Sequence, residues 1–426
     1  MWMDGLRDWR KRRGALAALA AAVVALSACN EDLQGGAACP SLCANQEVVI
    51  KDTVLEAVSF DTVVAGVPSI GSEGALLLAS RGDTLDTRVV MRFDSLVSRV
   101  TRSSIDSAVT AVDSVYLLLR VNASRTKVRD SVRVELYNVD TTANDTSAAA
   151  ILALFRPDRL LGASVFDSAG VKDSMRVYFD NARFLSLVTG PKRLRVGLKV
   201  SGRKGAIVSL GSWDASNAAS LKYDPVPEDT AIKEVTLDLR SDSPTGNLDL
   251  ASDLRDYTVI AQAPALPGPS QLSVGGLPSR RTFLRFNVPP KILDSATVLR
   301  ATLLLTQVPT PLLQRTDSTL LLPVVVNAGE EVTDFARTVE LISGSPVDTL
   351  RVAAPDSGLR QIEVAAALRQ WSSSTNTFRQ QRALVIRSND EGLGVGEARF
   401  WSVRAPAGVR PRLRVSYSLR TSFGIP

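Results

Sequence analysis

The sequence predicts an all-β protein built from two tandem antiparallel β-sandwich domains. Short apolar runs of four to eight residues alternate with polar residues, and clusters of Asp, Gly, Ser, Asn and Pro separate these runs. One pattern of such runs also occurs twice along the chain. The chain has 426 residues, whereas a single hydrophobic core stops growing at roughly 250 to 300 residues. Two domains are therefore expected.

The N-terminus has the pattern of a targeting segment. Five basic residues between Arg7 and Arg13 precede an apolar stretch of 14 residues, Ala15 to Ala28. Because a membrane span needs about 20 residues, the stretch predicts a cleaved signal peptide over residues 1–28. Leu26 to Cys29 reads Leu-Ser-Ala-Cys, which resembles the bacterial lipobox and implies a lipid on Cys29. The alternative is a plain secretory signal beside an incidental cysteine.

A lipid on Cys29 predicts an exported protein anchored to the membrane of the bacterial cell envelope, at the outer membrane or the cell surface. Residues 29–46 are then the lipidated cysteine and a linker. Cys39 and Cys43 lie in this linker, and we expect a local disulfide between them because exported proteins meet an oxidising compartment. A metal site is disfavoured because no third or fourth soft ligand follows.

The composition excludes several classes of function. The net charge is +6, but residues 1–28 hold five basic and two acidic residues, so the remainder carries +3. These charges are spread singly along the chain, so no nucleic-acid partner is predicted. The chain contains no histidine, which excludes Ser-His-Asp hydrolases and His-ligated zinc enzymes. We expect a non-enzymatic protein, with a polysaccharide-acting enzyme such as a lyase that uses Tyr and Arg as the alternative.

The internal repeat places the domain boundary near residue 228. Pro225, Pro227 and the acidic pair after them separate two halves that carry the same strands in the same order. We expect one domain over 47–227, a second over 228–420 and a tail over 421–426. The repeated runs are Arg88 to Asp94 and Arg281 to Asn287, Ser114 to Leu119 and Ala301 to Leu305, and Ser220 to Tyr223 and Arg412 to Tyr417.

Alternation identifies further strands and one face of the second core. Strands are predicted at residues 132–137, 194–200, 303–306, 320–326 and 383–387. The last strand alternates apolar and polar residues, which predicts a half-buried strand. Alternate residues of a strand lie on the same face of the sheet. In the last strand and in 281–287, this alternation predicts that five side chains share the core: Leu284, Phe286, Leu413, Val415 and Tyr417.

The second half carries five motifs that form a recognisable set: Arg281 to Asn287, Ala301 to Leu305, Ile362 to Trp371, Phe400 to Ser402 and Arg410 to Tyr417. In these residues it resembles the DNRLRE-type domain, a secreted bacterial module related to an alginate-binding carbohydrate-binding module. The first half resembles it through Arg88 to Asp94 but has no tryptophan in the place of Trp371. The resemblance implies a jelly-roll-like antiparallel sandwich, a carbohydrate-binding or structural role outside the cell, and an acidic polysaccharide as a candidate partner.

Trp213 is the candidate for contact with a sugar. It lies in the loop-like segment Gly211 to Asp214, where its ring could stack on the apolar face of a pyranose or anchor the loop. Core packing is favoured for Trp371 and Trp401, because aromatic residues dominate cores.

Arginine and acidic residues supply the remaining candidates. Arg92 and Arg285 alternate with core positions and could bind uronate carboxylates, or could simply form a solvated strand face. An acidic cluster between Ser241 and Asp256 offers oxygen ligands for calcium, although its spacing differs from an EF-hand and suits turn residues as well. No other cofactor is predicted. The members of the cluster are Asp242, Asn247, Asp249 and Asp253.

Overall fold

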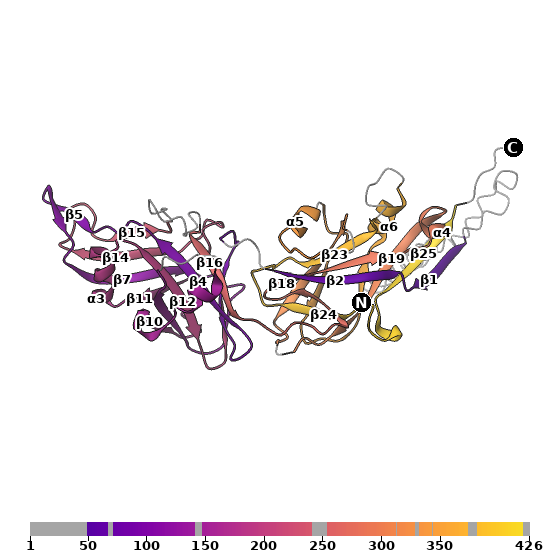
Figure 1. Cartoon of the computed structure of the whole chain (residues 1–426), viewed down its shortest axis with the longest axis horizontal. Helices are drawn as coiled ribbons and strands as arrows, with labels where there is room; N and C mark the ends of the chain where they lie inside the picture. The colour runs from indigo at the N-terminus through magenta and orange to yellow at the C-terminus, as the bar shows by residue number, and fades with distance from the viewer. Residues whose placement is uncertain are drawn as a thin grey trace, which may run out of the picture. The chain divides into compact units, whose positions relative to one another are not determined.

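A computed structural model describes residues 49–420 except 67–70, 141–146, 241–253, 312, 329–331, 343 and 374–380. Strands predominate in these residues, and every pairing between the named strands is antiparallel (Figure 1). The all-β class predicted from the alternating runs is confirmed.

The N-terminal sandwich consists of an eight-stranded sheet and a four-stranded sheet. The eight-stranded sheet has the order β10-β9-β12-β4-β3-β13-β8, with β16 also paired to β4, and the four-stranded sheet has the order β11-β7-β14-β15. A separate hairpin pairs β5 (Arg99–Arg102) with β6 (Ile105–Ala108). The strands of the two sheets are β3 (Leu76–Ser80), β4 (Asp86–Phe93), β7 (Ala111–Arg120), β8 (Lys127–Val128), β9 (Val132–Asn138), β10 (Leu160–Phe166), β11 (Ser174–Tyr178), β12 (Leu194–Ser201), β13 (Ala206–Leu210), β14 (Ser220–Val226), β15 (Val235–Asp238) and β16 (Asp256–Gln262).

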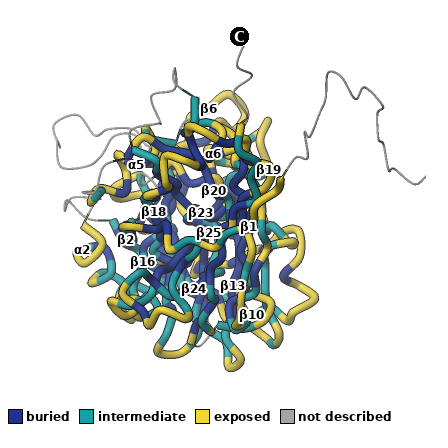
Figure 2. The backbone as a smooth tube through the Cα atoms, turned by 90° about the vertical axis from the view of Figure 1, so that its right-hand side faces the viewer, coloured by how far each residue is buried: buried dark blue, intermediate teal, exposed yellow. Residues whose placement is uncertain are grey.

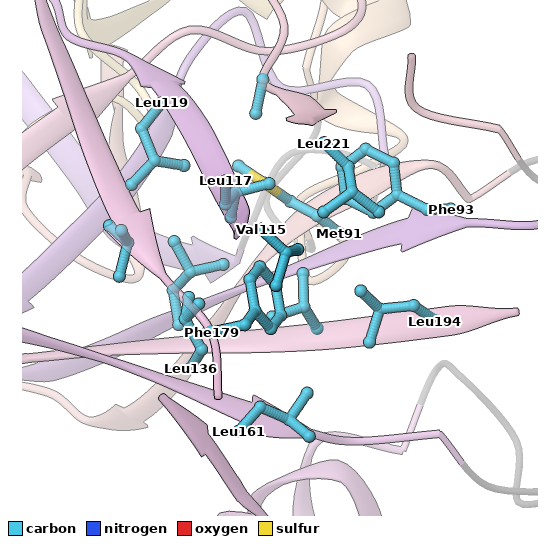
Figure 3. Packing of buried hydrophobic residues seen from close by; sticks show 14 of the residues in the cluster. Met91, Phe93, Val115, Leu117, Leu119, Leu136, Leu161, Phe179, Leu194 and Leu221 are labelled. Carbon is cyan, nitrogen blue, oxygen red and sulfur yellow. The ribbon is translucent and has the colours of Figure 1, made fainter. Parts of the chain in front are cut away.

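Alternating side chains of the two sheets form the core of this sandwich. On β7 the buried residues include Val115, Leu117 and Leu119, and Leu221 on the neighbouring β14 packs with them (Figure 3). Met91 on β4 belongs to the same cluster from the opposite sheet. Because alternate side chains of a strand point to the same face of its sheet, the apolar face of each sheet packs against the apolar face of the other sheet.

The C-terminal sandwich is one 11-stranded sheet that folds over itself. Its order is β1-β25-β19-β24-β17-β18-β23-β20-β21, with β2 paired to β18 and β22 paired to β19. Its strands are β1 (Ile50–Leu55), β2 (Val58–Gly66), β17 (Gln271–Gly275), β18 (Ser279–Phe286), β19 (Ala296–Val308), β20 (Ser318–Val326), β21 (Leu350–Ala353), β22 (Gly358–Glu363), β23 (Ala383–Ser388), β24 (Glu397–Trp401) and β25 (Arg412–Leu419).

One helix in each sandwich buries an apolar face against the core. In the N-terminal sandwich, the carboxylate of Asp180 caps α3 (Asn181–Thr189) by accepting a hydrogen bond from the Arg183 backbone, and Phe184 is buried. In the C-terminal sandwich, α6 (Ala365–Ser372) buries Trp371. The other helices are short: α2 (Ala148–Leu152), α4 (Pro290–Leu293), α5 (Thr338–Leu341) and two 3₁₀ turns at Pro157–Arg159 and Ala407–Val409.

The five side chains predicted to share the second core are largely buried. Leu284, Phe286, Leu413 and Val415 belong to one buried cluster, in which the Phe286 ring lies 5.2 Å from that of Trp371. Tyr417 is only half-buried and packs against the edge of the cluster.

In Figure 2 the buried parts of the chain follow the strands, whereas the exposed parts follow the connections. The five further strands predicted by alternation are also present, as β9, β12, β19, β20 and β23.

The predicted domain boundaries, 47–227 and 228–420, are wrong at the start of each half. The segment β1–β2, here called the first arm, pairs with β25 and β18 of the C-terminal sandwich. The segment β15–β16, the second arm, pairs with β14 and β4 of the N-terminal sandwich. Figure 1 shows the indigo strands β1 and β2 among orange and yellow strands. Each sandwich is thus completed by an arm from the other side of the predicted boundary.

Each arm fills one whole edge of a central strand, on the side opposite its local hairpin partner. Strand β17 pairs with β18 only through Gly275 and Arg280, and β2 pairs with β18 from Ser279 to Phe286. In the N-terminal sandwich, β16 likewise pairs with β4 from Asp86 to Met91, including the two residues that pair with β3, so β16 and β3 lie on opposite edges of β4. An open edge exposes unsatisfied backbone groups, so an arm is needed in both places.

Candidate functional site

The second arm holds the loop that carries Trp213. This loop joins β13 to β14, and the buried carboxylate of Asp256 on β16 accepts a hydrogen bond of 2.8 Å from the Trp213 backbone N–H. Burial raises the pKa of Asp256 to about 6, although the Trp213 N–H acts in the opposite direction. The loop also requires glycine at its start, because a Cβ at Gly211 would lie 1.9 Å from the Asn217 carbonyl oxygen.

The Trp213 ring is partly exposed and partly covered by an arginine. Its residue exposure is 38%, and the guanidinium of Arg255 lies 4.0 Å from the ring centre. This contact is a cation–π interaction, which restrains the ring on one side. A second partner could therefore stack only on the other face of the indole. The contact with Arg255 agrees with a role of Trp213 in anchoring its loop. The exposed part of the ring leaves room for the second role considered, stacking on a sugar.

Trp213 lines an open groove of about 800 Å³, within the 300 to 1,000 Å³ range of small-molecule sites. Three strand ends or neighbouring turns contribute its other walls: Arg120 ends β7, Asp173 precedes β11 and Asp238 ends β15. The remaining lining residues come from the Trp213 loop, namely Asp214, Ser216, Asn217 and Ala218.

The groove is more acidic than basic. Its lining includes three aspartates, Asp173, Asp214 and Asp238, but one arginine, Arg120. Hydroxyl and amide groups from Ser216 and Asn217 add neutral donors and acceptors. This combination of an aromatic face with carboxylate and amide acceptors suits a ligand rich in hydroxyl or amino groups. It is unfavourable for a polyanion, because like charges repel.

The structure does not bring the predicted arginines to this groove. Arg92 is 2% exposed, and its guanidinium lies 3.5 Å from both the Leu254 carbonyl oxygen and the Asp94 carboxylate. The alternative of a solvated strand face is therefore wrong for Arg92. Arg285, which is half-buried, lies on β18 in the C-terminal sandwich. Neither residue lines the groove beside Trp213.

The C-terminal sandwich has a related loop with different chemistry. Asp61 on β2 accepts a 2.6 Å hydrogen bond from the Val403 backbone N–H, as Asp256 does from Trp213. Val403 and Arg404 follow β24 where Trp213 and Asp214 follow β13. A smaller pocket of about 320 Å³ lies here, and its lining contains no aromatic residue. Trp371 is fully buried and Trp401 half-buried, so the accessible indole with a groove belongs to the first sandwich.

Three tyrosines carry raised pKa values, the opposite of what a tyrosine base in a lyase requires. Burial raises the pKa of Tyr137 to about 12, with a further contribution from its hydrogen bond to Glu135. Burial also raises the pKa of Tyr116 and of Tyr223. The Tyr-and-Arg lyase alternative therefore finds no support at these residues.

Several predicted sites lie outside the described residues. They are Cys29, Cys39 and Cys43 in the N-terminal segment, and Asp242, Asn247, Asp249 and Asp253 of the calcium candidate. Within the described part of the chain, no group of three or more acidic or cysteine side chains is placed to hold a metal ion. The helices described there include none long and apolar enough to cross a membrane.

Sequence reasoning identified Trp213 but missed the residues that position it. Asp256 and Arg255 lie 43 and 42 positions after Trp213 in the chain, and their contact with the loop depends on the pairing of β16 with β4. The buried aspartate before a run of β-branched residues occurs in both arms, as Asp61 and Asp256. That repeated aspartate was the available signal.

Comparisons with known proteins do not identify the chain. No family model matches it, and no curated protein matches it. Among solved structures, it is similar to a protein titled BspA_C_mut, at 7% identity and a TM-score of 0.15 over 82% of this chain and 91% of that one. A second similarity is to the VP2 subviral particle of infectious bursal disease virus, at 9% identity and a TM-score of 0.11 over 88% and 78% of the two chains. Such low scores support no conclusion about function.

Proposed function

We propose that the protein is a non-enzymatic carbohydrate-binding protein of the bacterial cell envelope, held to the membrane by a lipid on Cys29. The observation that carries the binding role is the partly exposed Trp213 ring at the side of a polar groove. Sugars stack their apolar C–H faces on such rings while their hydroxyls bind nearby polar groups. The envelope location rests on the Leu-Ser-Ala-Cys sequence that ends at Cys29.

The charges of the groove favour neutral sugars or amino sugars over the acidic polysaccharide expected from the family resemblance. Asp173, Asp214 and Asp238 can accept hydrogen bonds from hydroxyl or ammonium groups. A uronate would meet these three like charges, against the guanidinium of Arg120 and that of Arg255, which covers one face of the Trp213 ring. Arg92, the predicted uronate ligand that lies in the same sandwich as the groove, is buried and paired with Asp94. The proposed ligand is therefore a neutral or amino-sugar polysaccharide.

A glycan array probed with the chain lacking residues 1–29 tests the binding role. We expect binding to neutral or amino-sugar glycans, and a loss of about tenfold in affinity for Trp213→Ala because a stacking contact is removed. Ile105→Ala is the matched control, since Ile105 is 67% exposed on the separate hairpin. Equal binding by the Trp213 variant, preference for alginate, or no glycan binding at all would each contradict the proposal.

The lipid anchor has its own test. Replacing Cys29 with Ser removes the thiol that would carry the lipid, so we expect the variant to move from the membrane to the soluble fraction. Replacement of Cys39 with Ser serves as the control and should leave the distribution unchanged. A membrane-bound Cys29→Ser protein would show that the lipoprotein assignment is wrong.

A further inference from the structure

The two arms are repeats of one another in sequence. Ile50–Leu55 reads IKDTVL, and residues 232–237 read IKEVTL. Further along, each arm has an aspartate that is at most 3% exposed, Asp61 in the first and Asp256 in the second. Each aspartate lies within the strand of its arm that pairs along the edge of β18 or β4.

The two arms also pair in the same register. Leu55 lies opposite Leu413 on β25, and Leu237 lies opposite Leu221 on β14. In turn, Leu413 pairs with Leu303, as Leu221 pairs with Leu117. The second strands agree as well, because Asp61 pairs with Leu284 and Asp256 pairs with Met91, which occupy equivalent places in the repeated Arg-x-x-x-Arg-Phe run. The strands that receive the arms, β18 and β25 in one sandwich and β4 and β14 in the other, are thus equivalent.

The two arms differ in the number of residues that separate them from the strands with which they pair. The second arm begins at Val235, soon after one of its partner strands, β14, ends at Val226, and its other partner is β4 of the same sandwich. The first arm ends at Gly66, whereas its partner strands begin at Ser279 and Arg412, beyond the whole N-terminal sandwich. In the described residues both strands of the first arm thus pair only beyond a separately folded sandwich, whereas the second arm has a partner strand close by in the chain. An arm of a second copy can compete with such a tethered segment through its concentration. The first arm is therefore the one that can most easily be replaced by an arm from elsewhere.

The C-terminal sandwich nevertheless requires an arm. Ala57 and Val58 of the first arm are buried in its core, and β2 covers the edge of β18 over almost its full length. Departure of the arm would expose these side chains and two rows of unsatisfied backbone groups, on β18 and on β25. An identical arm from a second copy would restore the same contacts without any new interface.

We propose that the first arm is exchangeable and that the C-terminal sandwich can take the arm of a second copy of the chain. Each copy then donates β1–β2 to its neighbour and receives the same segment in return, which gives an arm-exchanged dimer. The partner is thus another molecule of this protein, recognised through backbone pairing with β18 and β25 and through the buried Asp61. The inference is independent of the groove beside Trp213.

Disulfide trapping with the full mature chain tests the exchange. Asp52 on β1 and Ser416 on β25 are paired residues whose side chains are hydrogen-bonded to each other. With Cys39 and Cys43 replaced by Ser, one chain carries Asp52→Cys and a second carries Ser416→Cys. After mixing at high protein concentration and mild oxidation, we expect a disulfide between the two chains, because only an arm in trans brings the two cysteines together.

Two further chains make the outcome decisive. The double variant Asp52→Cys with Ser416→Cys should form a bond within one chain at low concentration, which verifies the pairing itself. A chain with Arg203→Cys, at a side chain 88% exposed, measures random collision with Asp52→Cys. We expect several-fold more cross-linking of the Asp52 and Ser416 variants than of this control. Equal yields would overturn the proposal, as would failure of the double variant to form its internal bond.

Discussion

Glu397 forms ion pairs with two arginines inside the C-terminal sandwich. Its carboxylate lies 2.8 Å from Arg280 and 2.6 Å from Arg399, and it accepts a 2.8 Å hydrogen bond from the Ser273 hydroxyl. The side chains of Arg280 and Glu397 are fully buried. Burying a charge is costly unless a partner compensates it, so the cluster is stable only as a complete set.

Removing Glu397 should therefore be strongly destabilising. We expect Glu397→Ala to lower the free energy of unfolding by about 3 to 5 kcal/mol, because it leaves buried guanidinium groups uncompensated. Asp106→Ala, which breaks an ion pair between side chains 56% and 62% exposed, should cost less than about 1 kcal/mol. Urea unfolding of both variants measures the difference, and similar losses would show that the buried cluster is not held by its charges.

Glu73 links the start of the N-terminal sandwich to the second arm. Its carboxylate accepts hydrogen bonds from the backbone N–H groups of Gly71, at 2.7 Å, and Thr258, at 3.3 Å. Burial raises the pKa of Glu73 to about 7, and the nearby Asp256 also raises it. The folded protein therefore keeps a proton on this group at pH values where the unfolded chain has released it.

The sign of the resulting pH dependence follows from this difference. Because the folded pKa is above the unfolded value of 4.5, the stabilisation is complete below about pH 4.5 and is lost as the pH rises to about 7. At most about 3 kcal/mol is involved, since each pKa unit corresponds to about 1.4 kcal/mol. Urea unfolding across pH 5 to 8 should show a decline in stability that Glu73→Gln reduces. An equally steep decline in the variant would mean that Glu73 does not titrate in this range.

At the level of single elements, the sequence pattern located ten of the 25 strands in the described residues, because strand formation depends in part on the local side-chain pattern. It also placed Leu413 and Val415 in the core. Alternation did not show which sandwich each arm belongs to. The two arms have similar patterns of apolar residues, and backbone hydrogen bonds do not distinguish one arm from the other. It failed as well at Arg92, whose burial beside Leu254 depends on residues more than 160 positions away.

Strand β18 gives a direct test of the core register. Phe286→Ala removes a ring that is 3% exposed and packs on Trp371, so we expect a loss of roughly 3 to 5 kcal/mol. Arg414→Ala, at an exposed position on β25, should change stability by less than about 0.5 kcal/mol. Denaturant unfolding of the whole chain is the measurement, because the second half alone lacks its arm. Comparable losses from the two substitutions would contradict the assigned register.

At the level of the whole molecule, two repeated sandwiches are joined by crossed arms. The strands of residues 47–227 do not form a complete sandwich, since β15 and β16 lie beyond residue 227. Residues 71–266, by contrast, contain every strand of the N-terminal sandwich together with the second arm. The groove beside Trp213 lies within residues 71–266, because Asp238, which lines it, and Asp256, which binds the Trp213 backbone, both come from the second arm.

Urea unfolding of these two fragments tests the crossed arrangement most directly. We expect residues 71–266 to unfold in a single cooperative transition, because every strand pairing of the N-terminal sandwich lies within the fragment. Residues 47–227 should show no cooperative transition, since the edges of β4 and β14 lose the second arm and the first arm lacks its partners. A cooperative transition for 47–227, with a stability equal to or greater than that of 71–266, would contradict the account.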